Sequence, residues 1–306
     1  MSRNTLKLIA LLVAAAFAGG AQAQESKVQV NKVDQTQTDG TQNKQYLDVG
    51  NVDGKGKSDV KTGNITQKQT AGAGNTQKMG VGNVAGSGSS KVNTGNVSQT
   101  QSGGAQNKQT MGVGNVAGSG KSDVTTGTIT QQQVGGSGAT QDMQMGNVKG
   151  SGQSKVTTGA VNQYQGGSSG SKQTMGVGNV DGSGKSKVST GAITQRQTSS
   201  GSTQDMAVGN VKGGGQSNVT TGAIGQRQTG ASNTQKMGLG NVEGSGKSGV
   251  VTGPVTQQQS GVGNKQDLQV GNVKGDGKSD VKIPGGITQS QGGQNNTQST
   301  NIGNVK

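Results

Sequence analysis

Residues 60–91 read VKTGNITQKQTAGAGNTQKMGVGNVAGSGSSK, and variants of this stretch fill almost the whole chain. Its most regular landmark is the tripeptide Gly-Asn-Val, which recurs at intervals of 31 or 32 residues. A fixed period of this length is typical of stacked repeat proteins, in which each copy contacts only its neighbours. The repeat therefore favours an assembled surface, rather than one pocket, as the place of function. The glycines of the tripeptide are Gly50, Gly82, Gly114, Gly146, Gly178, Gly209, Gly240, Gly271 and Gly303.

In two segments of each copy, every second position is occupied by a recurring apolar residue or glutamine. They are Ile-x-Gln-x-Gln, at 65–69 in the quoted copy, and Gln-x-Met-x-Val, at 77–81. A period of two is typical of β-strands, whereas the glycine-rich clusters at 71–74 and 85–89 are typical of turns. We predict an all-β fold, a β-solenoid of cross-β stacked coils with two short strands and two glycine-rich arcs per repeat. Each repeat makes either one coil or two of half the length, and one is favoured because its halves do not superimpose.

Each copy begins at a leading valine, which defines a nine-repeat domain over residues 28–306. Residues 24–27 form a short lead before it, and we expect both terminal coils to lack a capping element. Uncapped coils expose unpaired strand edges. The copies start at residues 28, 60, 92, 124, 156, 188, 219, 250 and 281.

Residues 1–23 have the features of a secretory signal peptide. Arg3 and Lys7 supply the basic start, residues 8–17 the short apolar run, and residues 21–23 the small-residue cleavage site. No other segment approaches the ~20 apolar residues that a membrane-spanning helix needs. We therefore expect a secreted protein, located outside the cell or at its surface.

The composition excludes several kinds of chemistry. The chain has no Cys and no His, which rules out disulfides, thiolate chemistry, imidazole catalysis and the usual zinc sites. Only 25% of the residues are apolar and 60 are glycine, a composition that a disordered chain would also have. The repeat argues against disorder, because a disordered chain places no demand on which residue recurs at which offset.

The recurring glutamines, methionines, valines and asparagines are candidate members of structural ladders. Glutamine suits a stack because its amide both donates and accepts a hydrogen bond. The alternative for the glutamines is a solvent-facing spacer, and a Cu(I) site is the alternative to core packing for the methionines. The candidates are Gln67, Gln69, Gln77, Met79, Val81, Asn83 and Val84 in the second copy, Gln131, Gln133, Gln141, Met143 and Asn147 in the fourth, and Gln195, Gln197, Gln204, Met206 and Asn210 in the sixth.

The Gly-Asn-Val tripeptide interrupts strict alternation and is interpreted as the corner of each coil. Val84 follows the previous inward position, Val81, by three residues instead of two. A Gly-Asn pair bends the backbone readily because both residues tolerate the left-handed conformation. The next valine would then still point inward, and the asparagines could stack inside the bend.

Charges at equivalent positions alternate from copy to copy. Identical charges stacked one coil apart would repel, so alternation is expected if neighbouring copies are one coil apart. The first series is Lys149, Asp181, Lys212, Glu243 and Lys274. The second is Lys57, Ser89, Lys121, Gln153, Lys185, Gln216 and Lys247, after which Lys278 breaks the pattern.

Motifs for catalysis or cofactor binding are weak. Residues 118–122, GSGKS, resemble the end of a phosphate-binding loop, but Asn115 stands where that loop needs a glycine. The acidic residues occur singly, without the clustering of calcium-binding repeats. We expect no catalytic, metal or cofactor site, and hence no enzyme.

Residues 122–133, SDVTTGTITQQQ, are followed by a glycine-rich arc and then by residues 141–145, QDMQM. This arrangement resembles the strand–turn–strand repeats of curlin-type subunits of bacterial functional amyloid. The copies here are longer and add a second arc at Gly-Asn-Val. The resemblance implies export, extracellular polymerisation and a place in a biofilm matrix or cell surface, and it carries over no catalytic residue.

Three functions remain as expectations. The first is a secreted, non-enzymatic subunit whose partner is itself, in a head-to-tail homopolymer that forms amyloid-like fibres. The second is a soluble cationic repeat protein that binds anionic polysaccharide, extracellular DNA or a membrane surface, since the formal net charge is +14. The third is a largely disordered matrix chain.

Overall fold

A computed structural model describes residues 6–7 and 25–305, with gaps at 54–55, 86–87, 118–120, 150–152, 168, 183 and 214. The expected signal peptide lies outside the described residues except for the two-residue strand β1 (Leu6–Lys7). Within the described residues the fold is all-β. No helix among them is long and apolar enough to cross a membrane.

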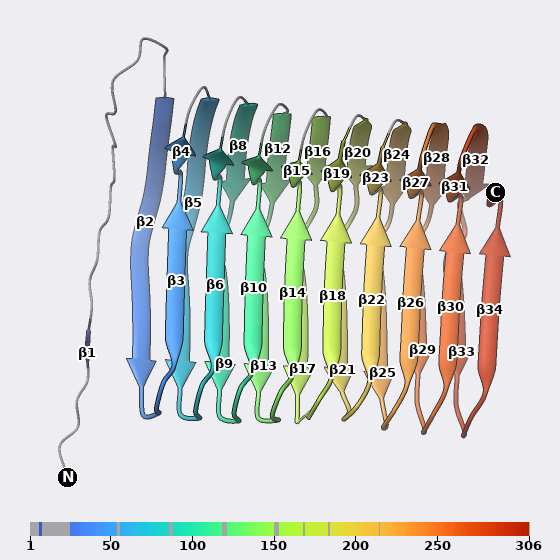
Figure 1. Ribbon diagram of the computed structural model, residues 1–306. Coiled ribbons are helices and arrows are strands. Elements are labelled where there is room, and N and C mark those ends of the chain that lie inside the picture. Colours follow the sequence, from blue (N-terminus) through green and yellow to red (C-terminus); the bar gives the residue numbers. More distant parts are fainter. Residues whose placement is uncertain are drawn as a thin grey trace.

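The chain winds into a β-solenoid whose coils lie side by side from the N-terminal to the C-terminal end (Figure 1). One coil contains four strands, and residues 121–149 show them in order. We name them by their typical inward residue. They are the serine strand β12 (Lys121–Thr126), the glutamine strand β13 (Ile129–Val134), the methionine strand β14 (Thr140–Met145) and the valine strand β15 (Val148–Lys149).

The same four strands recur in the other coils. The serine strands are β8 (Gly88–Thr94), β12, β16 (Gln153–Thr157), β20 (Lys185–Ser189), β24 (Gln216–Thr221), β28 (Gly246–Thr252) and β32 (Gly277–Ile283). The glutamine strands are β9 (Val97–Ser102), β13, β17 (Val161–Gly166), β21 (Ile193–Thr198), β25 (Ile224–Thr229), β29 (Val255–Gln259) and β33 (Ile287–Gln291). In the first two coils both types run together as β2 (Glu25–Thr38) and β5 (Gly56–Thr70).

The second half of each coil supplies the other two types. The methionine strands are β3 (Lys44–Val49), β6 (Thr76–Val81), β10 (Lys108–Val113), β14, β18 (Lys172–Val177), β22 (Thr203–Val208), β26 (Thr234–Leu239), β30 (Lys265–Val270) and β34 (Thr297–Ile302). The valine strands are β4 (Val52–Asp53), β7 (Val84–Ala85), β11 (Val116–Ala117), β15, β19 (Val180–Asp181), β23 (Val211–Lys212), β27 (Val242–Glu243) and β31 (Val273–Lys274).

The expectation of two strands per repeat was wrong, because part of each expected arc is also a strand. In β12, Ser122, Val124 and Thr126 are buried while the residues between them face outward. This segment alternates as a strand does, although glycine and serine precede it. Its ladder partners come from the neighbouring coils, and they supply the hydrogen bonds that local composition does not predict.

Neighbouring coils pair in parallel and in register, residue by equivalent residue. Gln109 of β10 lies opposite Gln77 of β6 on one side and Gln141 of β14 on the other. This register confirms one coil per repeat. The methionine strands form a nine-stranded sheet and the valine strands an eight-stranded one. The chain therefore makes about eight complete turns, and a single bridge from Val273 to Val305 begins the ninth valine strand.

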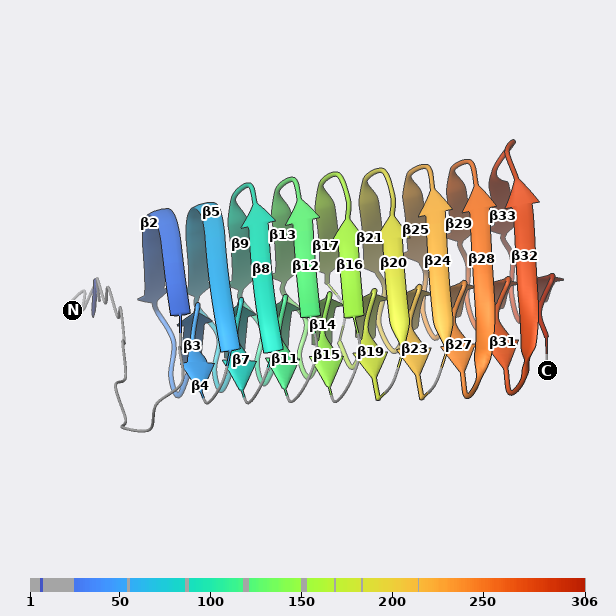
Figure 2. The same cartoon turned by 90° about the horizontal axis from the view of Figure 1, so that it is seen from above.

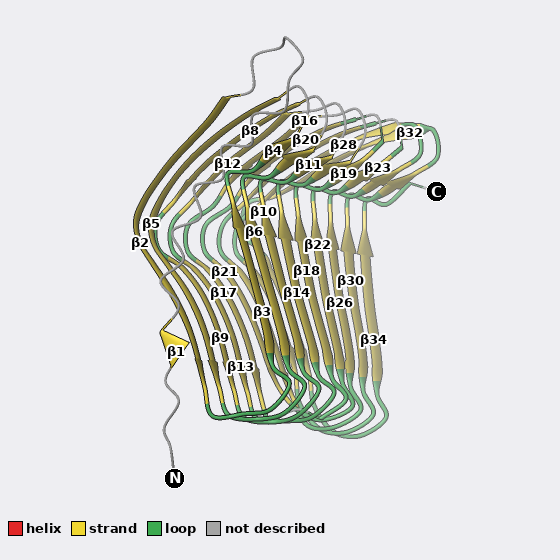
Figure 3. Ribbon diagram, turned by 60° about the vertical axis from the view of Figure 1, so that its left-hand side comes forward, coloured by secondary structure: helices red, strands yellow, loops and turns green. Residues whose placement is uncertain are grey.

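The core has two compartments because each coil is bent. The glutamine and methionine strands, together with the inward valines of the serine strands, enclose the main core, which contains Val60, Ile65, Met79 and Val81 in the second coil. Figure 3 shows the bend between the serine and glutamine strands, and Figure 2 shows the serine and valine strands from above. The valine strands supply a second, separate row that includes Val84 and Val116.

Candidate functional site

The most regular feature of the solenoid is its set of buried glutamine ladders. Gln67 Nε2 donates to Gln99 Oε1 of the next coil at 3.0 Å, and Gln99 Nε2 donates to Gln131 Oε1 at 2.9 Å. Gln131 also donates to the backbone oxygen of Thr110 at 3.1 Å. The ladder thus satisfies amides that would be costly to bury unpaired, and it ties the two faces of the core together.

The other predicted glutamines form two further ladders. Gln133 Nε2 donates to Gln165 Oε1 at 3.1 Å, and Gln141 Nε2 donates to Gln173 Oε1 at 2.9 Å. All of these side chains are buried, and none is a solvent-facing spacer. The predicted members placed in the three ladders are Gln67, Gln131 and Gln195, then Gln69, Gln133 and Gln197, then Gln77, Gln141 and Gln204.

The predicted apolar residues pack in the core. Met79, Met143 and Met206 are each at most 2% exposed and lie in one column with Val81 nearby in the main core. Val84 is buried too, but in the second compartment. The inward direction expected after the corner is therefore observed, and it leads to a different row of contacts.

The glycine of Gly-Asn-Val makes the corner through its backbone and its lack of a side chain. Gly82 has φ of +71° and Gly146 has φ of +64°, a conformation that favours glycine. A Cβ on Gly82 would also collide with the Val60 side chain. Both residues tolerate the left-handed conformation, but only the glycine adopts it, since no Asn of these tripeptides has positive φ.

A serine column that sequence reasoning missed fastens the corners, except in the fourth coil, where Ser122 Oγ has no hydrogen-bond partner among the described residues. Ser58 Oγ donates to the backbone oxygen of Gly82, and Ser154 Oγ donates to that of Gly178. Both serines are at most 2% exposed. The sequence did contain a sign of this column, because a serine precedes the leading valine by two residues in all nine copies.

The asparagines stack outside the bend, not inside it as expected. Asn83, Asn147 and Asn210 are only partly buried. Asn115 Nδ2 donates to Asn83 Oδ1 at 2.7 Å, and the backbone N–H of Asn210 donates to Asn241 Oδ1 at 3.0 Å. They lie over the outer face of the methionine strands, where the inner volume is already filled by the valines.

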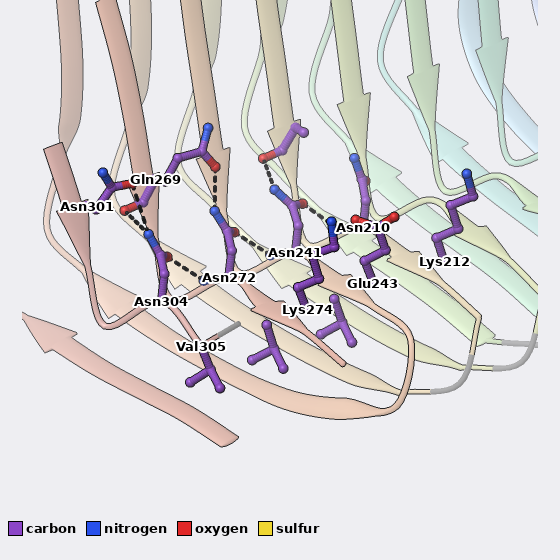
Figure 4. A pocket seen from close by; sticks show the side chains of 13 residues that line it. Asn210, Lys212, Asn241, Glu243, Gln269, Asn272, Lys274, Asn301, Asn304 and Val305 are labelled. Atoms are coloured by element: carbon purple, nitrogen blue, oxygen red, sulfur yellow. Dashed lines mark hydrogen bonds between the residues drawn. The ribbon is translucent and has the colours of Figure 1, made fainter. Parts of the chain in front are cut away.

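A groove of about 570 Å³ runs along this asparagine stack in the last coils. Figure 4 shows Asn241, Asn272 and Asn304 in a row beside it. Its rim carries Lys212, Glu243 and Lys274 on neighbouring valine strands, so opposite charges follow one another as the sequence suggested. Asn272 Nδ2 donates to Gln269 Oε1 at 2.5 Å, and the rim has two lysines against one glutamate, so the groove is polar with a small excess of positive charge.

A second groove, of about 460 Å³, has a different character and lies over the serine strands. Lys155 and Lys187 are direct register neighbours, with Lys185 and Lys121 beside them. None of these four lysines forms an ion pair with another described residue. We call this surface the lysine groove, and its charge makes it attractive to anions.

The two ends of the solenoid present strand edges. At one end β34 pairs with β30, and its other edge has no partner strand among the described residues. At the other end β3 pairs only with β6 in the described part of the chain, while β2 pairs with β5 and also touches β1 through Gln37 and Thr36. Such edges are templates for a further strand.

No described group of three or more His, Cys, Asp or Glu side chains gathers where it could hold a metal ion. The geometry therefore offers ladders, grooves and edges as candidate functional surfaces. Comparisons with protein-family models, with curated proteins and with solved structures found no match to this chain.

Proposed function

We propose that this protein is a secreted, non-enzymatic structural subunit that stacks end to end into amyloid-like fibres of a biofilm matrix or cell surface. The observation that carries the proposal is the pair of open strand edges at the ends of a fully in-register stack. Every coil inside the solenoid is completed by an equivalent coil on each side, and a second copy would do the same for the end coils.

Burial along the stack supports the same proposal. Gln131 and Met143 in the fourth coil are not exposed at all. Their equivalents in the first coil, Gln35 and Leu47, are only partly buried. Apolar and amide surface is thus left open at the ends, and covering it would stabilise an assembled state.

The experiment uses the chain from residue 24 onward, purified unfolded and then allowed to fold at increasing concentration. Electron microscopy is expected to show unbranched fibres, and X-ray diffraction a reflection near ~4.7 Å along the fibre axis. A protein that light scattering shows to be folded and monomeric at every concentration would contradict the proposal. Export is tested separately, by locating the full-length chain and a chain lacking residues 2–23 in a bacterial host.

A second candidate function, binding of an acidic polysaccharide, is favoured by the lysine groove. Polyuronate is the probe and neutral dextran its control. Binding that weakens steeply between low and physiological salt, and that falls in the variant Lys155→Gln/Lys187→Gln, would support it. If that variant and the parent chain bind polyuronate equally, the lysine groove is not the binding site.

A further inference from the structure

We propose that copies join in register, with the ninth coil of one copy stacked on the first coil of the next, and with Asp280 paired to Lys27 across the junction. This inference rests on the proposed function and specifies its partner surface. The partner is a second copy of this chain, and the two end coils are its matching faces.

The outward column that contains Lys27 supplies the first argument. Along the first coils its charge alternates, because Lys27 lies opposite Asp59, and Asp59 lies opposite Lys91. The column ends at Asp280, whose neighbour in the previous coil is the uncharged Gly249. A copy added in register sets Asp280 against Lys27, so that the junction pairs opposite charges as the first coils do, although Lys155 and Lys187 are like-charged neighbours in the middle of the same column.

The adjacent outward column gives the same result independently. It begins at Glu25, which lies opposite Lys57, and it ends at Lys278. An in-register junction therefore sets the backbone position of a glutamate beside that of a lysine. In this arrangement two neighbouring columns with reversed signs both match.

The hydrogen-bond direction of the ladders fixes the polarity of the junction. Every glutamine–glutamine hydrogen bond of the three ladders has its donor in the earlier coil, as in Gln45 Nε2 to Gln77 Oε1 at 2.9 Å and Gln266 Nε2 to Gln298 Oε1 at 3.0 Å. The last amide, Gln298 Nε2, donates to no described group, and the first oxygen, Gln45 Oε1, accepts from none. The last coil thus offers donors and the first coil offers acceptors.

Apolar burial selects the register. Val28 starts the column of leading valines and is 41% exposed, whereas Val281 at the other end is 7% exposed. Stacking in register covers Val28 with its own equivalent. A shift of one residue would instead place outward charged side chains over the core columns.

The test is a charge exchange between the two ends. The single variants Lys27→Asp and Asp280→Lys place like charges at every junction, and each is expected to elongate roughly tenfold more slowly than the parent chain at low salt. An equimolar mixture of the two variants restores opposite charges at each mixed junction, and so does the double variant. Both are expected to recover the parent rate.

Matched controls carry the same charge changes in the middle of the stack, Lys108→Asp and Asp142→Lys, where the register neighbours are threonines. Both positions tested at the ends are exposed, so circular dichroism of the monomers is expected to be unchanged. Lys27→Asp also places an aspartate beside Asp59, and this effect is present equally in the double variant.

If the parent chain forms fibres and the single variants elongate as fast as the control variants, the proposed junction is wrong while the proposed function still stands. Slow single variants that neither the mixture nor the double variant rescues would overturn the junction as well. A parent chain that forms no fibre would contradict the proposed function itself, and the junction with it.

Discussion

Gly146 illustrates how much of this fold depends on single atoms. Its φ is +64°, and an added Cβ would collide with Val124 while lying 2.8 Å from Ser122 Oγ. The corner therefore needs glycine for conformation and for space at once. The same two demands recur in every coil, which explains why a glycine stands at this position in all nine copies.

Three glycine-to-alanine variants separate the two demands. Gly146→Ala is expected to destabilise the fold by more than about 2 kcal/mol, because it combines left-handed strain with overpacking. Gly138→Ala keeps the strain, with φ of +65°, but has nothing within 4 Å, and about 1 kcal/mol is expected. Gly225→Ala has neither feature and should be neutral. Urea unfolding of the three measures this order, and equal losses for Gly146 and Gly138 would contradict the packing argument.

A buried glutamine contributes through its neighbours as well as through itself. Gln163→Leu would leave Gln131 Nε2 without its ladder acceptor and Gln195 Oε1 without its ladder donor. We expect a loss of about 1–3 kcal/mol in thermal unfolding. The control is Gln132→Leu, since that side chain faces outward on the neighbouring glutamine strand, β13. A ladder of no energetic importance would make the two variants alike.

At the scale of the element, the repeat works as an interchangeable coil. The four strands of one coil form their backbone sheet hydrogen bonds with the equivalent strands of the coils before and after. The inward residues that meet on either side of a coil are therefore equivalent residues of the repeat. The glutamine and methionine strands were recognised from their alternation alone. The serine strands were not, because glycine and serine at their start have the composition of a turn.

Removal of one whole coil is therefore expected to be tolerated. Deletion of residues 124–155 joins Asp123 to Val156, which is the equivalent of Val124, and leaves every column in phase. The shortened chain should keep its β-sheet circular dichroism and unfold in one transition. Deletion of residues 124–139 removes half a coil and should instead split unfolding into two transitions. Equal behaviour of the two deletions would contradict the coil as the unit of stacking.

For the whole molecule, stability is expected to be lowest at the two ends. Apart from contacts within itself, each coil contacts only the coil before it and the coil after it. The first and ninth coils therefore each lack one neighbouring coil among the described residues. Hydrogen exchange of the monomer should therefore be fastest at residues 28–53 and 281–305 and slowest in the fourth to sixth coils. In fibres the end coils should become as protected as the middle. End coils that stay fast in fibres would argue against end-to-end contact.

The sequence by itself determined the period, the all-β class and the glutamine and methionine columns. These follow from local alternation, which needs only the chain's own order of residues. The choice of one coil per repeat over two, which the sequence only favoured, was settled by the register. Only the tertiary structure decided that Ser122 to Thr126 is a strand, that the valine after each corner enters a second compartment, and that the asparagines lie outside the bend. It also brought Lys155 beside Lys187. Each of these depends on which residue lies one coil away and on the space left by a bent coil, and neither is contained in a single copy.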